Sequence, residues 1–215
     1  DLVEEFITYV NQTNISLTAE VPHSIFETNS FLIENNVTLI EYATFFGSIQ
    51  IYQFLKMSKV KRAPILWHYA IHSNNADLIH LLESDIIDLP LGFHEGCFFE
   101  AVKCHQNEIA SYIQDNYLSS SNQASFLEKL FSTALKYHNY LYLPASIADD
   151  YEFFYLHLYG YYILAELFLR DQHESIQMIE AKGDTALNEA INNNRIVSIY
   201  ILLLKQNVLK DNVFN

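Results

Sequence analysis

The chain has 215 residues, half of them apolar and 14% aromatic, which excludes intrinsic disorder because enough apolar surface is available for a core. Five glycines and four prolines supply little turn chemistry, so we expect a mainly helical protein rather than hairpins. The net charge of -14 argues against nucleic-acid and anionic-membrane binding, which depend on Lys and Arg, and leaves a protein or peptide as the expected partner.

Two cysteines, Cys97 and Cys104, are too few for the disulfide framework of a small secreted domain. We therefore expect a reducing compartment and a cytoplasmic location. No secretory signal is recognised in the sequence given, and we expect the chain to be a fragment of a longer protein. The most apolar run, residues 153–169, is interrupted by polar residues including Glu166, so we interpret it as core helices rather than a membrane span.

The first 36 residues have no counterpart in the repeat that follows them. The spacing of apolar residues over 2–10 predicts a helix, which we expect to cap the rest of the chain. Residues 11–36 are a mixed connection with no periodicity that fixes their path. We therefore divide the chain into an N-terminal helical cap and connection, residues 1–36, and a helical repeat array, residues 37–215.

An internal repeat becomes visible when six residues are aligned as anchors. The anchors are Ala43, Ala70, Ala101, Ala134, Leu156 and Ala190. Three positions earlier stand large apolar residues, namely Ile40, Trp67, Phe98, Phe131, Phe153 and Leu187. Four positions later stand residue types that tolerate a positive φ, namely Gly47, Asn74, His105, His138, Gly160 and Asn194. We expect a short helix to end in the left-handed conformation at each of these turn positions.

A second apolar face begins eight positions after most anchors and continues at positions eleven and twelve. Spacings of three and four predict a second amphipathic helix, so each unit is expected to be a helix, a left-handed turn and a helix. Such a pair cannot bury its apolar faces alone, and neighbouring pairs are therefore expected to stack. The small anchor would let the stacked helices approach closely.

Three segments carry a resemblance to a known repeat family. Residues 39–51 and 66–79 resemble an ankyrin helix pair, and residues 185–190 read Thr-Ala-Leu-Asn-Glu-Ala, similar to the family's Thr-Pro-Leu-His-x-Ala opening. The anchors lie 22 to 34 residues apart and scatter around the ankyrin period of 33. Over residues 37–208 the chain resembles the divergent ankyrin proteins of trichomonad protists, including their repeat-adjacent domain of unknown function. The resemblance implies an all-α, ankyrin-like solenoid.

The chain also departs from the family pattern. Residues 58–64 and 85–90 lack the Gly and Asp of the projecting β-hairpin, so we expect these fingers to be shortened or missing. Pro144 falls inside the second helix expected in the fourth unit, and proline breaks helix interiors. Leu156 is larger than the usual anchor. We therefore expect the stack to be distorted between residues 135 and 152.

Three groups of reactive residues are candidates for a metal or catalytic site. Zinc accepts His and Cys, but Cys97 and Cys104 stand seven residues apart, so we favour buried or turn residues over a site built from them with His94 and His105. Neighbours on a helix point in different directions, so Cys104 followed by His105 is weak evidence for a nucleophilic thiol. The pair Asp149 and Asp150 is better explained by a helix start than by a carboxylate site.

We therefore predict a non-catalytic scaffold with no cofactor, metal or small-molecule substrate, and we expect a monomer. Positions just before the anchors, and two or three after them, should face away from the core, and in the ankyrin family this open face commonly meets the partner. The candidate partner-binding residues are Tyr69, His72, Glu100, Lys103, Thr133, Lys136, Glu189, Asn192 and Asn193. The alternative is a passive structural module of a larger protein whose catalytic domain is absent from this fragment.

Overall fold

A computed structural model describes residues 1–85, 89–118, 124–143, 150–165, 187–188, 190–200 and 202–203. Its regular structure is helical, as the composition predicts, and among these residues extended pairing is limited to one isolated antiparallel bridge between Glu20 and Thr38. The chain divides into two units, Asp1–Ser119 and Ser120–Asn215, and each is described by itself. Within the described residues, none of the helices combines the length and the apolar character that crossing a membrane requires.

The predicted N-terminal helix is confirmed as α1, Val3–Thr13. It packs on α4, Ile49–Met57, where the rings of Phe6 and Phe54 meet edge to face at 6.1 Å. The carboxylate of Asp1 accepts the backbone N–H groups of Gln50 and Ile51 at 2.5 and 3.2 Å. These N–H groups have no partner within their own helix, and a negative charge is favourable there.

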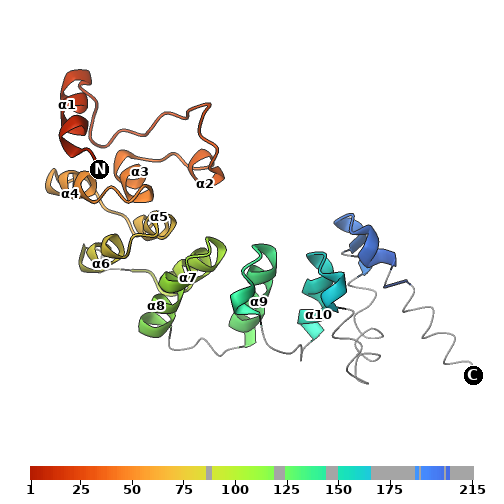
Figure 1. Cartoon of the computed structure of the whole chain (residues 1–215). Helices are drawn as coiled ribbons and strands as arrows, with labels where there is room; N and C mark the ends of the chain where they lie inside the picture. Colours follow the sequence, from red (N-terminus) through yellow and green to blue (C-terminus); the bar gives the residue numbers. More distant parts are fainter. Residues whose placement is uncertain are drawn as a thin grey trace, which may run out of the picture. The chain divides into compact units, whose positions relative to one another are not determined.

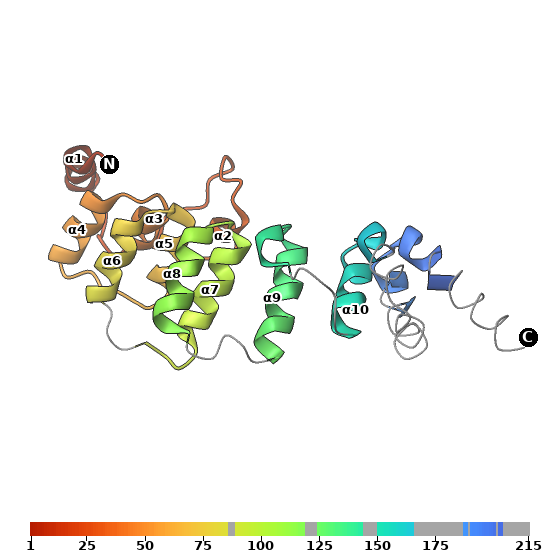
Figure 2. The same ribbon diagram turned by 60° about the horizontal axis from the view of Figure 1, so that its bottom comes forward.

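From Leu39 onward, the helices of the first unit contact one another in pairs (Figure 1). The helices are α3 (Leu39–Phe45) with α4, α5 (Leu66–Ser73) with α6 (Ala76–Asp85), and α7 (Phe93–Lys103) with α8 (Asn107–Tyr117). The first members of the pairs also pack in a row, α3 on α5 and α5 on α7 (Figure 2). These contacts are those of an all-α unit in which two helices alternate along residues 39–117.

The left-handed turns predicted from the sequence are confirmed. All six turn positions have a positive φ: Gly47, Asn74, His105, His138, Gly160 and Asn194. In five of the six windows the N–H of the next residue donates to the carbonyl of the anchor at 2.7 to 2.9 Å. Examples are Gln106 to Ala101 and Asn139 to Ala134. This is the outer hydrogen bond of a Schellman motif, which satisfies a carbonyl that the end of the helix leaves without a partner.

Substitution of the exposed Asn74 tests the turn. Its φ is 52°, so we expect Asn74→Val to lower the free energy of unfolding by about 1–2 kcal/mol, because a β-branched residue is disfavoured there. Asn74→Gly should be neutral or stabilising, since glycine adopts this conformation without strain. The control is Gln53→Val on the exposed face of α4, which should change stability by about 0.5 kcal/mol or less. Urea denaturation measures all three, and equal losses in both valine variants would contradict the assignment.

The core contains the anchors and apolar residues that stand three positions before them. All six anchors are buried, as are Ile40, Trp67, Phe98 and Phe131 three positions before them. Thr38 starts α3 with a capping box, in which the Glu41 carboxylate accepts the Thr38 N–H at 2.7 Å. The small anchors Ala43, Ala70 and Ala101 thus lie on the buried sides of α3, α5 and α7.

Two carboxylates on α6 connect the second helices of the pairs. Asp85 accepts hydrogen bonds from Tyr52 Oη at 3.0 Å and Lys56 Nζ at 2.5 Å on α4. Burial raises the pKa of Asp85, but these hydrogen bonds and the positive charges beside it outweigh that effect and leave its pKa lowered. On the other side, Glu83 accepts the hydroxyl hydrogens of Tyr112 at 2.7 Å and Tyr117 at 2.6 Å.

In the second unit, α9 (Ala124–Lys136) is followed by a single 3₁₀ turn, η1 (Tyr140–Tyr142), and later by α10 (Asp150–Leu158). The second helix expected in the fourth repeat is therefore reduced to η1 among the described residues, and Pro144 lies outside them. Leu156 is fully buried with Phe131, Leu135 and Ala165.

The predicted loss of β-hairpin fingers agrees with the loop after α4, which the described chain crosses at residues 58–65 without a strand. Residues 86–88, in the other loop, lie outside the described chain.

Candidate functional site

One residue of the predicted open face, Tyr69, does not lie on that face. Tyr69 does not face solvent: only 3% of it is exposed, and the expectation that its side chain turns outward is wrong. A short helix, α2 (Ser30–Ile33), covers it. The ring of Phe31 meets the Tyr69 ring edge to face at 5.0 Å, and Leu32 and Val37 complete a small apolar cluster.

The covering segment is held at both ends. The Asn29 side chain caps α2 by accepting the N–H of Phe31 at 3.0 Å. The two ends of the segment are joined to each other, since Val21 donates its N–H to the Val37 carbonyl at 2.7 Å and Leu39 donates its N–H to the Ala19 carbonyl at 3.1 Å. The N-terminal connection, whose path the sequence does not indicate, thus lies over α3 and α5.

Three of the predicted residues do converge, at the junction of α5 and α7. His72 Nε2 lies 2.8 Å from a Glu100 carboxylate oxygen, and the same carboxylate accepts hydrogen bonds from Lys103 Nζ at 3.2 and 3.4 Å. The His72 and Glu100 side chains are only 12% and 15% exposed, whereas Lys103 is 35% exposed. The ring of His72 also lies against the ring of Phe31 in a tilted arrangement at 4.3 Å, and it stacks on Phe45 at 5.1 Å.

Cys104 completes this group, which we name the His72–Glu100–Cys104 cluster. Its Sγ atom lies 3.6 Å from both ring nitrogens of His72 and 3.8 Å from Glu100 Oε1. The sequence pairs Cys104 with its neighbour His105, and the histidine that approaches it instead comes from the preceding repeat. The repeat alignment could have indicated this contact. His72 stands two positions after the anchor of its repeat, and Cys104 stands three positions after the anchor of the next repeat.

The electrostatics of the cluster oppose a nucleophilic thiol. Burial raises the pKa of Glu100, but the hydrogen bond from His72 and the charge of Lys103 outweigh it and lower the pKa to about 2. Burial first, and then the negative charge of Glu100, raise the pKa of the Cys104 thiol to about 12. A reactive cysteine has a lowered pKa, so without a further positive charge this thiol stays protonated at neutral pH.

The zinc set considered from the sequence is not brought together. Within the described residues, the His, Cys, Asp and Glu atoms close enough to share a metal are those of the His72–Glu100–Cys104 cluster. Cys97 is fully buried, and burial raises its pKa to about 12. His94 stacks on Tyr117 at 4.0 Å, and His105 occupies a left-handed turn.

The other predicted residues belong to the second unit. Thr133 donates its hydroxyl hydrogen to the Lys129 carbonyl at 2.7 Å, and Lys136 is exposed with its ammonium 5.3 Å from the centre of the Tyr137 ring. Asn192 and Asn193 are exposed, while Glu189 lies outside the described residues. Of the acidic pair, Asp149 also lies outside them, and α10 begins at Asp150 as the helix-start interpretation predicts.

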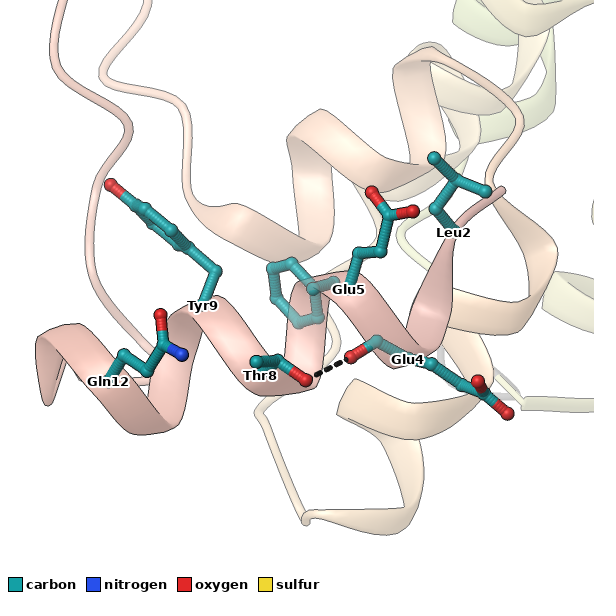
Figure 3. Close-up of a pocket in the computed structure, with 7 residues that line it drawn as sticks. Leu2, Glu4, Glu5, Thr8, Tyr9 and Gln12 are labelled. Carbon is teal, nitrogen blue, oxygen red and sulfur yellow. Dashed lines mark hydrogen bonds between the residues drawn. The ribbon is translucent and has the colours of Figure 1, made fainter.

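A pocket is present on α1, but its composition does not indicate chemistry. Its lining comes from the N-terminus and one helix, and the polar contact within it is the 2.8 Å hydrogen bond from Thr8 Oγ1 to the Glu4 carbonyl (Figure 3). A catalytic or ligand site needs polar groups that converge from several elements. The lining residues are Leu2, Glu4, Glu5, Phe6, Thr8, Tyr9 and Gln12.

Comparisons with protein-family models, curated proteins and solved structures gave no match to this chain. The described structure defines the class of the protein as all-α.

Proposed function

We propose that the chain is a non-catalytic scaffold, an ankyrin-like solenoid of helix pairs that binds a protein or peptide. The observation that carries the proposal is the left-handed turn at all six positions that the repeat alignment marks. The row of α3, α5 and α7 supports it, because stacked pairs present the same helix positions side by side. Two free thiols support a reducing, cytoplasmic setting.

The proposed binding face is the predicted open face without Tyr69. In the first unit it lies on α7, near the half-exposed Lys103, because α2 covers the corresponding positions of α5. In the second unit it includes Lys136, Asn192 and Asn193. The net charge of -14 favours a partner with complementary positive charge, since charge complementarity speeds association.

The burial of Tyr69 favours a second candidate function. An open face that a segment of the same chain already covers is unavailable to a partner, at least along α2. The alternative is therefore a passive structural module that supports another part of a longer protein.

Matched variants of the chain distinguish the two functions. We expect the triple variant Lys103→Ala, Lys136→Ala and Asn192→Ala to weaken binding by about tenfold or more, since interface side chains that matter cost over about 1 kcal/mol each. The control replaces Gln53 and Asp115, exposed on α4 and α8, by alanine and should bind as the parent does.

The partner is captured from the native cell with the parent chain, identified, and titrated against each variant by calorimetry. Equal affinities for the triple variant and the control would reject the open face and favour the passive module.

A further inference from the structure

The His72–Glu100–Cys104 cluster brings a nitrogen, an oxygen and a sulfur ligand to one place. Their ligand atoms all lie within 4.8 Å of one another. Glu100 lies on α7, Cys104 is the residue that caps the end of α7 four positions later, and His72 reaches them from the last turn of α5. Neither the repeat architecture nor the proposed binding role requires these three residue types to meet.

We propose that this cluster is a binding site for a thiophilic divalent cation, with zinc as the expected ion. Zinc accepts His nitrogen, carboxylate oxygen and Cys sulfur, and sites with three protein ligands leave the fourth position to water or another group. The thiol and the imidazole select against magnesium and calcium, which prefer oxygen ligands.

The surroundings prepare the cluster for a cation. Phe31 and Phe45 lie against the ring of His72 and limit its movement, which lowers the entropy lost when the ring becomes a ligand. His72 and Glu100 are largely buried, so a charge placed between them would be weakly screened. Burial here comes partly from α2, which would then support the site as well as covering α5.

When no metal is bound, one positive charge compensates Glu100, namely the Lys103 ammonium beside the carboxylate, which is 35% exposed. The Cys104 thiol needs no compensating charge, because it keeps its proton and is neutral. Binding of the ion forms the metal–sulfur bond, breaks the S–H bond and releases that proton to solvent, because the thiolate is the ligand.

Cobalt(II) is the probe, because a cobalt–thiolate bond gives an absorption band that reports the sulfur ligand directly. We expect the band when the reduced, metal-free full chain is titrated with Co²⁺, and its loss when Zn²⁺ is added. Cys104→Ser should abolish the band and weaken Zn²⁺ binding by about tenfold or more. Cys97→Ser is the matched control on the same helix and should retain the band.

Lys103→Ala provides a test that does not depend on losing a ligand. Removing the cation that competes for Glu100 should tighten Zn²⁺ binding by about two- to fivefold. Helical circular dichroism of every variant confirms folding. Absence of the thiolate band in the parent chain, an equal band in Cys104→Ser, or unchanged affinity in Lys103→Ala would each overturn the proposal.

Discussion

Replacing Trp67 by alanine is expected to lower the free energy of unfolding of the first unit by about 3–5 kcal/mol. Trp67 stands three positions before the anchor of α5 and is 1% exposed. Its ring meets His94 of α7 at 5.6 Å and Tyr117 of α8 at 6.2 Å, both edge to face. The cavity left by alanine would therefore open between two neighbouring helix pairs.

Trp67→Phe tests a smaller loss of volume, because phenylalanine keeps an aromatic ring at this position. The indole Nε1 is buried and has no hydrogen-bond partner among the described residues. Phenylalanine removes this atom without breaking a hydrogen bond, so we expect a cost below about 1.5 kcal/mol. Tyr9→Ala on the exposed side of α1 is the control, and urea denaturation followed by circular dichroism measures all three. If Trp67→Ala lowered the free energy of unfolding as little as Tyr9→Ala does, the position three residues before the anchor would not belong to the core.

The features that were predictable from the sequence are those determined by local chemistry. Residue types that tolerate a positive φ, such as Asn74 and His138, indicate the ends of helices without knowledge of their neighbours. The anchor and the apolar residue before it share one helix face, so their burial follows from periodicity. Both properties can be read within a window of about ten residues.

The features that were not predictable depend on contacts distant in sequence. The helix α2 has four residues and no periodicity, and nothing local to Phe31 indicates that it packs on His72. The burial of Tyr69 follows from that contact, so the sequence placed it wrongly on an open face. Predicting the contact between Cys104 and His72 would have required the alignment of two neighbouring repeats in space.

The same helix junction bears on both proposals. Lys103 is at once a candidate contact for a partner and the cation that competes with a metal at Glu100. We expect a bound metal to displace the Lys103 ammonium from Glu100, so the metal and the partner should influence each other's binding. Measuring partner affinity with and without Zn²⁺ connects the two experiments.

In the second unit, Leu156→Ala is expected to lower the free energy of unfolding by about 2–5 kcal/mol. Leu156 is the one large anchor, and it is fully buried among Phe131, Leu135 and Ala165. Alanine, the residue found at the other five anchors, would leave a cavity here, because the helices around Leu156 are already arranged for a larger side chain.

Hydrogen exchange in α9 and α10 measures the effect, since amides protected by this core should exchange faster as the unit loses stability. Leu141→Ala in η1 is the control, because Leu141 is exposed and its truncation should cost about 0.5 kcal/mol or less. A small loss for Leu156→Ala would mean that the helices move closer around alanine, as at Ala101. A large loss would mean that in this repeat a larger side chain fills the space between helices that do not approach closely. The irregular spacing of this repeat would then reflect a different packing around the same left-handed turn.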